Sequence, residues 1–407
     1  MKNGIIGILT FVIIALLFIK CEEDSPTKPN NENGTVYNLT HYDDVLLKIN
    51  NYYVYIDSSG AIGEATLFGL GESVGLGDNY IRILHKAGLW VGAYINGVAH
   101  ANIIWVGSPR FGNFIAKSND RRTGIYYVDP GILAEENFNG LIPYGFPSDQ
   151  QNQPRLLGDA MCWSALETDT SANTGVYRNP IPNLRVSQAL YSYMDSDLDQ
   201  VFFLQYEIEN RSSQRYDEVH VGFYSDTDLL YAENATGYDS SLGLSYTYSP
   251  QDSIFYPKPS YVTGFTLLET PLENGNPVGV GSHRIMRKDI NFNFAYGERF
   301  FNTPEEVLYA LKGLSNFGNP MVNPTNSQET KFAFTGDPVA QTGWLDDIPN
   351  DVRSLLSSAP FTLASGERKR VSIVWVVESG QELAGALANL KSKIDNVKQS
   401  DHLWKFD

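Results

Sequence analysis

The sequence contains very little cysteine. Cys21 and Cys162 are the two in 407 residues, and Cys21 follows directly after an N-terminal apolar run. If Cys21 is modified there, Cys162 has no partner within the chain, so the fold must be held by its core without an internal disulfide. The neighbours of Cys162, Met161 and Trp163, are apolar. That context favours a buried, inert thiol over a nucleophile.

Positive charge is also scarce. The chain has 30 Lys and Arg against 47 Asp and Glu, a net charge of −17. Removal of Lys2 and Lys20 with a leader peptide would take away two positive charges and leave −19. Such a chain is repelled by the phosphates of nucleic acids and by anionic lipid headgroups, so both are excluded as partners.

Catalytic motifs with their expected context are missing. Gly71–Gly75 reads G-E-S-V-G, but a nucleophile elbow requires a helix directly after it, and the residues that follow, L-G-D-N, begin a helix poorly. The six histidines show no zinc-ligand spacing. Acidic pairs suited to glycoside hydrolysis occur, although their separation in space cannot be read from the sequence. The sequence therefore favours a non-catalytic protein and leaves a carboxylate-pair hydrolase open.

What the chain has in quantity is aromatic residues, with 24 Tyr and 21 Phe. Together with short, branched apolar runs and many glycines, they favour strands over helices. From Val201 to Ile208, alternate residues form one fully apolar face and one mixed face, and Val219–Tyr224 repeats the pattern. Asn96-Gly97 between two alternating runs predicts a hairpin. We expect a mainly β protein, a large antiparallel β-sandwich with long loops.

Two helices are expected within this β-rich chain. Thr303 to Glu306 form a capping box with Pro304 at the first helical position, which predicts a short helix near 304–312. A C-terminal amphipathic helix is predicted from six apolar residues on one face: Leu383, Ala386, Leu387, Leu390, Ile394 and Val397. Before it, Ser365-Gly366 between two apolar runs predicts a further hairpin.

An acidic loop follows the strand at 219–224. Its candidate metal ligands are Asp226, Asp228, Glu233, Asn234 and Asp239. Oxygen ligands at short, irregular spacing suit Ca²⁺, which takes six to eight of them, although the EF-hand pattern does not match. The alternative is a solvent-exposed loop in which the aspartates cap turns.

The segment 107–159 has weak strand signals and many turn residues, which predicts long loops, where binding sites often lie. Its aromatic residues Tyr126, Tyr127, Tyr144 and Phe146 are candidate ligand-binding residues. The alternative is that these rings anchor the loops in the core.

The N-terminus has the layout of an export signal. Lys2 precedes an apolar run, Ile5–Ile19, which is short for a membrane span, and Lys20-Cys21 follows. With the polar stretch after Cys21, this resembles bacterial lipoproteins, whose cysteine is lipid-modified, although Lys20 departs from their usual small residue. We expect a signal peptide at 1–20, a lipidated tether at 21–35, a single β-rich domain at 36–400 and a tail at 401–407. The resemblance implies an outer-membrane or cell-surface lipoprotein, attached to the membrane by its lipid. The alternatives are ordinary secretion and an uncleaved N-terminal anchor.

Several runs within the domain show a further resemblance. They are Gly88–Ala93, Phe203–Asn210, Gly222–Asp228, Gly336–Trp344 and Leu355–Phe361. Over roughly residues 60–400 they resemble an uncharacterised β-rich module found in exported proteins of Bacteroidetes- and Ignavibacteria-like bacteria. Those relatives often carry a C-terminal sorting domain, whereas this sequence ends at Asp407, so a lipid on Cys21 would replace that anchor.

These features together favour a surface-tethered, non-catalytic module that binds a ligand or a protein partner. A glycan is the candidate ligand, and calcium would order the acidic loop. The alternatives are the carboxylate-pair hydrolase and a purely structural protein of the cell envelope.

Overall fold

The computed structural model describes residues 44–49, 52–57, 59–68, 80–104, 114–115, 124–168, 179–229, 233–249, 260–287, 301 and 303–406. Residues 39–407 form one compact unit. The predicted signal peptide, the tether with Cys21 and the Gly71–Gly75 motif lie outside the described residues. Within the described chain, no helix combines the length and the apolar character needed to cross a membrane.

The first layer is an antiparallel sheet. In spatial order its strands are β1 (Asp44–Ile49), β2 (Tyr52–Asp57), β3 (Ile62–Phe68), β4 (Tyr80–Ile95), β11 (Tyr216–Asp226), β20 (Asn350–Ser358) and β17 (Val280–Arg287). β5 (Val98–Asn102) pairs with the end of β4, and β21 (Phe361–Leu363) pairs with the start of β11. The predicted turn between β4 and β5 is confirmed, since Asn96 and Gly97 have φ of 53° and 77°.

The second layer is also antiparallel. Its strands in order are β7 (Ile125–Val128), β8 (Ala160–Thr168), β9 (Leu184–Ser192), β10 (Val201–Asn210), β22 (Arg368–Gly380), β14 (Ser260–Glu269), β13 (Leu244–Tyr248) and β12 (Glu233–Asp239). β6 (Phe114–Ile115) also pairs with β8, and the start of β12 pairs with β20, which joins the layers at one corner. Two small hairpins lie outside the layers, β15 (Leu272–Glu273) with β16 (Asn276–Pro277) and β18 (Met321–Asn323) with β19 (Gln328–Thr330).

The core lies between the two layers because their strands alternate. On β10, Phe202, Leu204, Tyr206 and Ile208 face inward and pack against the inner residues of β4, β11 and β22 in one cluster. Phe202 stacks on Trp375 of β22, with ring centroids 5.7 Å apart. Cys162 also lies in this cluster, fully buried, and burial raises the pKa of its thiol. The predicted mainly β antiparallel sandwich is confirmed.

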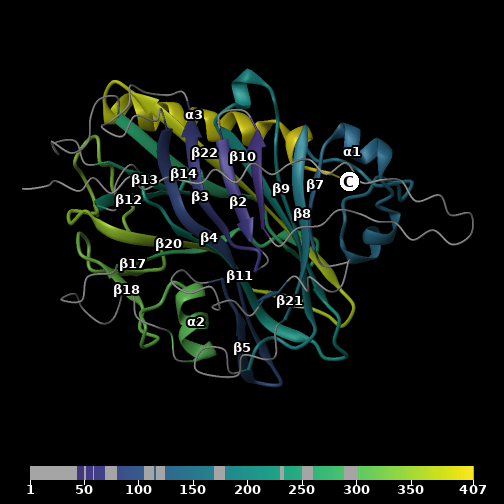
Figure 1. Cartoon of the computed structure of the whole chain (residues 1–407). Helices are drawn as coiled ribbons and strands as arrows, with labels where there is room; N and C mark the ends of the chain where they lie inside the picture. The colour runs from purple at the N-terminus through teal and green to yellow at the C-terminus, as the bar shows by residue number, and fades with distance from the viewer. Residues whose placement is uncertain are drawn as a thin grey trace, which may run out of the picture. The chain divides into compact units, whose positions relative to one another are not determined.

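Helices cover the outer faces of both layers (Figure 1). α3 (Leu383–Gln399) lies on the second layer, and all six residues of its predicted apolar face are buried there. α2 (Pro304–Leu311) lies on the first layer, next to the stacked rings of Trp90 and Tyr224. Thr303 caps α2 by accepting a hydrogen bond from the Glu306 amide at 3.3 Å, as its capping box predicts.

The segment 107–159, in which loops are predicted, contains regular elements where it is described. It holds β7, the short helix α1 (Pro130–Glu135) and the 3-10 helix η1 (Asn139–Tyr144). Two further 3-10 turns are η3 (Ser196–Leu198) and η4 (Asp401–Leu403).

The predicted hairpin at Ser365-Gly366 is wrong. β21 pairs with β11 in the first layer, whereas β22 pairs with β10 and β14 in the second, so this turn crosses between layers. The connection from β10 to β11 crosses in the same way, and the two crossings are bound together. The buried Asn210 side chain donates to the carbonyl of Leu363 at 3.0 Å, and its backbone carbonyl accepts from the Gly366 amide at 2.7 Å.

Two glycines allow α2 to approach its sheet. Gly92 on β4 and Gly222 on β11 face outward beneath the helix. A Cβ on Gly92 would lie 2.7 Å from Leu308 Cδ2 and 2.8 Å from Leu311 Cδ1, both in the buried face of α2.

We therefore expect Gly92→Ala to lower the free energy of unfolding by about 1–3 kcal/mol, the usual cost of overpacking. Gly385→Ala is the matched control. Gly385 lies in α3 with open space around its Cα, so the same added methyl should raise the free energy of unfolding by up to about 1 kcal/mol through helix propensity. Urea unfolding of both variants measures the effect. A Gly92→Ala variant as stable as the native chain would contradict the close packing.

Candidate functional site

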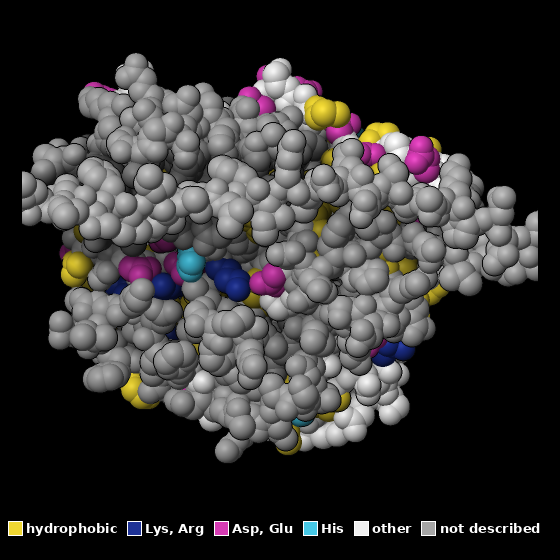
Figure 2. All heavy atoms as spheres, in the orientation of Figure 1, with side chains coloured by type: hydrophobic (Ala, Val, Ile, Leu, Met, Phe, Trp, Pro, Cys, Tyr) yellow, Lys and Arg dark blue, Asp and Glu magenta, His cyan; other side chains and the backbone are white. Residues whose placement is uncertain are grey.

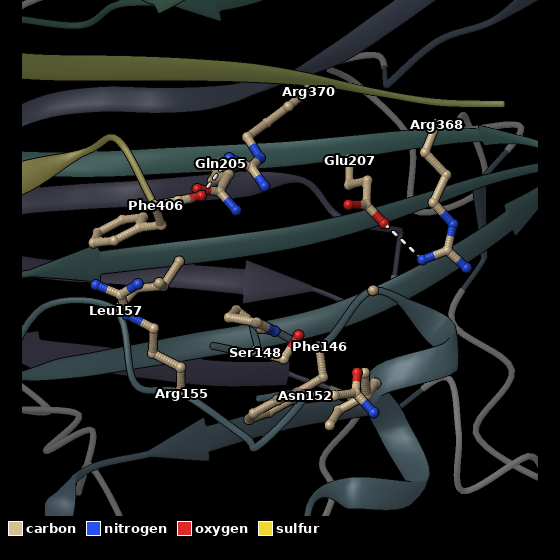
Figure 3. A pocket seen from close by; sticks show the side chains of 13 residues that line it. Phe146, Ser148, Asn152, Arg155, Leu157, Gln205, Glu207, Arg368, Arg370 and Phe406 are labelled. Carbon is tan, nitrogen blue, oxygen red and sulfur yellow. Dashed lines mark hydrogen bonds and ion pairs between the residues drawn. The ribbon is translucent and has the colours of Figure 1, made fainter. Parts of the chain in front are cut away.

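A pocket of about 200 Å³ lies on the outer face of β10 and β22 (Figure 3). Along these strands the outward residues change from apolar, such as Phe203, to polar, such as Gln205 and Glu207. The antiparallel register sets Glu207 opposite Arg370. The pocket is lined by Ile142, Gly145, Phe146, Pro147, Ser148, Asn152, Arg155, Leu157, Gln205, Glu207, Arg368, Arg370 and Phe406.

The wall opposite the strands is the segment 142–157. Gly145, with φ of 92°, ends η1, and a Cβ there would lie 2.4 Å from Ser187 Oγ of β9, so glycine lets the segment reach the sheet. Phe146 stacks on Phe138 at 4.8 Å, and the carboxylate of Asp149 accepts two backbone amides of its turn. These contacts hold the wall in place.

The end of the described chain forms a third wall. The hydroxyl of Tyr193 donates to the carbonyl of Leu403 at 2.9 Å, and Arg370 Nη1 donates to the carbonyl of Phe406 at 2.7 Å. The guanidinium of Arg155 lies 4.6 Å from the centre of the Phe406 ring. The pocket is thus assembled from four segments that are distant in the sequence: 142–157, β10, β22 and the stretch around Phe406.

Most charges near the pocket are paired. Arg368 binds Glu207 at 3.1 Å and Glu209 at 3.2 Å, and Arg185 binds Glu209 at 3.4 Å and Glu167 at 2.9 Å. Acidic and basic side chains also lie side by side on the described part of the face in Figure 2.

Two arginines of the pocket differ from this pattern. Within the described chain, neither Arg155 nor Arg370 has a carboxylate at ion-pair distance. In addition, Arg370 Nε and Gln205 Oε1 are shielded from solvent and have no hydrogen-bond partner among the described residues. A buried polar atom without a partner costs roughly 1–3 kcal/mol, so this donor and this acceptor would gain from a bound molecule.

The four aromatic residues predicted as ligand-binding do not come together in one site. Tyr126 and Phe146 are 1% and 2% exposed and belong to a core cluster with Trp163. Tyr127 is half-buried against the core, and Tyr144 lies under the guanidinium of Arg185 at 4.4 Å. Phe146 is the one of the four that lines the pocket. The polar lining was not predicted, although the alternate arginines at the start of β22 are a sequence signal that could have suggested it.

Three carboxylates gather where the two layers join. Ligand atoms of Asp226, Asp228 and Asp351 lie within 4.8 Å of one another, a donor set that could hold a metal ion. Asp226 is the last residue of β11 and Asp351 is the second residue of β20, and the pairing of β11 with β20 brings them together. Arg353 binds Asp226 at 3.2 Å and Asp351 at 2.5 Å. Three carboxylates thus lie around the guanidinium of Arg353.

Of the five predicted metal ligands, Asp226 and Asp228 lie in this cluster. Asn234 binds the backbone of Leu229 through both ends of its amide, at 2.9 and 3.0 Å. Asp239 caps the turn to β13 through Ser241 and pairs with Lys391 at 2.8 Å. The backbone of Glu233 pairs with Asp351, which sequence reasoning did not identify as a ligand.

A buried serine–histidine pair has the connectivity of a catalytic dyad. His283 Nδ1 must donate to the carbonyl of Ala333 at 3.0 Å, so its Nε2 accepts from the hydroxyl of Ser245 at 3.0 Å. However, His283 and Ser245 are 0% and 1% exposed, so no substrate reaches them. Burial lowers the pKa of His283 to about 4, and it does the same for His220. Both histidines are neutral structural residues near pH 7.

Burial shifts the pKa of one carboxylate, that of Asp346, upward rather than downward. Asp346 pairs with Arg287 and accepts from the Thr236 amide at 3.0 Å. Burial nevertheless outweighs the attraction of Arg287 and raises the pKa of Asp346 to about 6.

These pKa values predict how stability depends on pH. Between pH 6.5 and about 4, His283 binds a proton in the unfolded chain but stays neutral in the folded protein. The free energy of unfolding is therefore unaffected by His283 above pH 6.5 and falls as the pH is lowered through this range. The full loss is on the order of 3 kcal/mol. Asp346 binds its proton more tightly in the folded protein than in the unfolded chain. Its contribution to the free energy of unfolding therefore increases as the pH falls from about 6 to 3.8, opposite to that of His283.

His283→Gln should therefore weaken the loss of stability between pH 7 and 4.5, and Asp346→Asn should strengthen it. Denaturant unfolding at both pH values gives the difference for each variant. Identical pH dependence in the native chain and in His283→Gln would show that His283 is not held neutral.

Comparison with known proteins gives little information about this chain. No family model matches the sequence, and no curated protein matches it. Among solved structures, a bacterial glucoamylase in complex with acarbose has a TM-score of 0.38 at 8% identity over 92% of this chain and 38% of its own. A putative aldose 1-epimerase from Escherichia coli K12 has a TM-score of 0.33 at 10% identity over 83% of this chain and 99% of its own. A copper-containing benzylamine oxidase from Hansenula polymorpha has a TM-score of 0.31 at 10% identity over 88% of this chain and 63% of its own. The chain thus spans well under half of the glucoamylase, and these likenesses are too weak to support an argument about function.

Proposed function

We propose that this chain is a surface-tethered, non-catalytic β-sandwich module that binds one sugar residue of a glycan in the pocket over β10 and β22. The observation that carries the proposal is the unmatched pair of buried polar atoms, Arg370 Nε and Gln205 Oε1, in the wall of a preformed pocket. The tether and the lipid on Cys21 are supported by the N-terminal sequence.

The size of the pocket limits the ligand. Pockets for drug-sized molecules measure about 300–1,000 Å³, whereas this one measures about 200 Å³. It therefore suits a small molecule or a single residue of a longer chain. Its walls are held by aromatic stacking and backbone hydrogen bonds, so little ordering is needed on binding.

The chemistry of the lining favours binding over hydrolysis. Glycoside hydrolases usually need two carboxyl groups on either side of the scissile bond. Among the residues that line the pocket, Glu207 is the one carboxylate, and it is bound to Arg368 at 3.1 Å.

Calcium at the acidic cluster is the second part of the proposal. Asp226, Asp228 and Asp351 offer three carboxylate ligands close together, and Ca²⁺ prefers carboxylate and carbonyl oxygens. Because the cluster joins β11 to β20, an ion there would stabilise the corner where the layers meet, far from the ligand.

Binding at the pocket can be tested by blocking it. The full chain, purified in detergent, is titrated with neutral and acidic mono- and oligosaccharides by calorimetry. We expect at least one sugar to bind, and Ser148→Trp to abolish binding because the indole fills the pocket. Gln150→Trp, on the exposed side of the same turn, is the matched control and should still bind. Binding that survives Ser148→Trp, or no binding by the native chain, would contradict the proposed function.

Calcium is tested by thermal melting of the full chain with Ca²⁺ and with chelator. Binding to the folded state should stabilise it by about 2.7 kcal/mol when the calcium concentration is 100 times Kd. Asp228→Asn should remove this stabilisation. Asp239→Asn should retain it, since Asp239 lies outside the cluster and pairs with Lys391. Equal melting temperatures with calcium and with chelator would contradict a calcium site at the three carboxylates.

A further inference from the structure

The pocket concentrates positive charge on an acidic protein. The chain has a net charge of −17, yet the lining contains Arg155, Arg368 and Arg370 against one carboxylate, Glu207. Arg368 is neutralised by its ion pairs with Glu207 and Glu209. Arg155 and Arg370 therefore supply the remaining charge, and an anionic group is the ligand chemistry that they fit.

These two guanidinium groups reach the pocket from different walls. Arg370 extends from β22, and Arg155 extends from the segment 142–157 across from it (Figure 3). Each is already oriented, Arg370 by the carbonyl of Phe406 and Arg155 by the Phe406 ring. Besides the N–H that binds the carbonyl of Phe406, the guanidinium of Arg370 has further N–H groups, and these are the donors that a carboxylate would accept from.

The second unmatched atom, Gln205 Oε1, requires a different kind of partner. Gln205 Oε1 is an acceptor, so its partner must donate a hydrogen bond. A carboxylate, a sulfate or a fully ionised phosphate has no hydrogen to donate, whereas a hydroxyl group does.

We infer that the pocket recognises a hydroxy-carboxylate, the acid sugar of an anionic glycan, with its carboxylate between Arg370 and Arg155 and a hydroxyl donating to Gln205. This inference rests on the proposed function, because it names the ligand class of the same pocket. The ligand carries one negative charge and at least one hydroxyl donor, which together satisfy both unmatched atoms.

The test compares four probes that separate these features. Galacturonate carries the charge and the hydroxyls, its methyl ester and galactose lack the charge, and cyclohexanecarboxylate lacks the hydroxyls. Titration of the full chain should give galacturonate an affinity at least about tenfold higher than that of each other probe, the value of one charge-assisted or buried hydrogen bond. Sulfate serves as an oxyanion with no hydrogen to donate.

Matched variants assign each contact. Arg155→Gln should weaken galacturonate binding about tenfold or more, whereas Arg215→Gln removes the same charge at an exposed arginine outside the pocket and should leave it unchanged. Gln205→Met keeps the length of the side chain and removes the acceptor. It should weaken galacturonate but not cyclohexanecarboxylate. Far-UV circular dichroism checks that each variant is folded.

The outcomes separate this inference from the proposed function. If galactose binds as tightly as galacturonate and Ser148→Trp abolishes both, the pocket binds sugars and the inferred ligand class is overturned. Equal binding of sulfate, which has no hydrogen to donate, overturns the hydroxyl contact. Galacturonate binding that Ser148→Trp does not change would overturn both the inference and the proposed function.

Discussion

The antiparallel pairing of β10 with β22 is the constraint on which the rest of this structure depends. It sets the rings of Phe202 and Trp375 side by side in the core and sets Glu207 opposite Arg370 on the outside. A shift of the register by one residue would turn the core residues outward and the charged residues inward. The same pairing therefore fixes both the sandwich and the floor of the pocket.

The two layers are tied at corners, and each corner uses polar groups. At one, Asn210 binds the crossing between β21 and β22, which satisfies buried backbone groups that neither sheet can pair. At another corner, Arg353 binds both Asp226 and Asp351 where β12 of the second layer pairs with β20 of the first. The structural role of this second corner and its proposed calcium site thus depend on the same carboxylates.

Much of the fold was predictable because strand and helix patterns are local. The alternation of Val201–Ile208, the turn at Asn96-Gly97 and the capping box at Thr303 were each predicted correctly. The hairpin at Ser365-Gly366 was not, because its two strands suit either a hairpin or a crossing between layers. Which one forms depends on distant partners, β11 for one strand and β10 and β14 for the other.

The sequence by itself determined which face of β10 and of α3 is buried, since alternation and amphipathic spacing specify the face that leaves water. It also determined the start of α2, the acidic excess and the scarcity of cysteine. Only the tertiary structure decided which distant groups meet. Asp351 joins Asp226 and Asp228, and Arg370 joins Arg155 and Gln205, through strand pairings and a packed C-terminal segment. The physical reason is that a periodic pattern fixes the orientation of a side chain but carries no information about its partner across space.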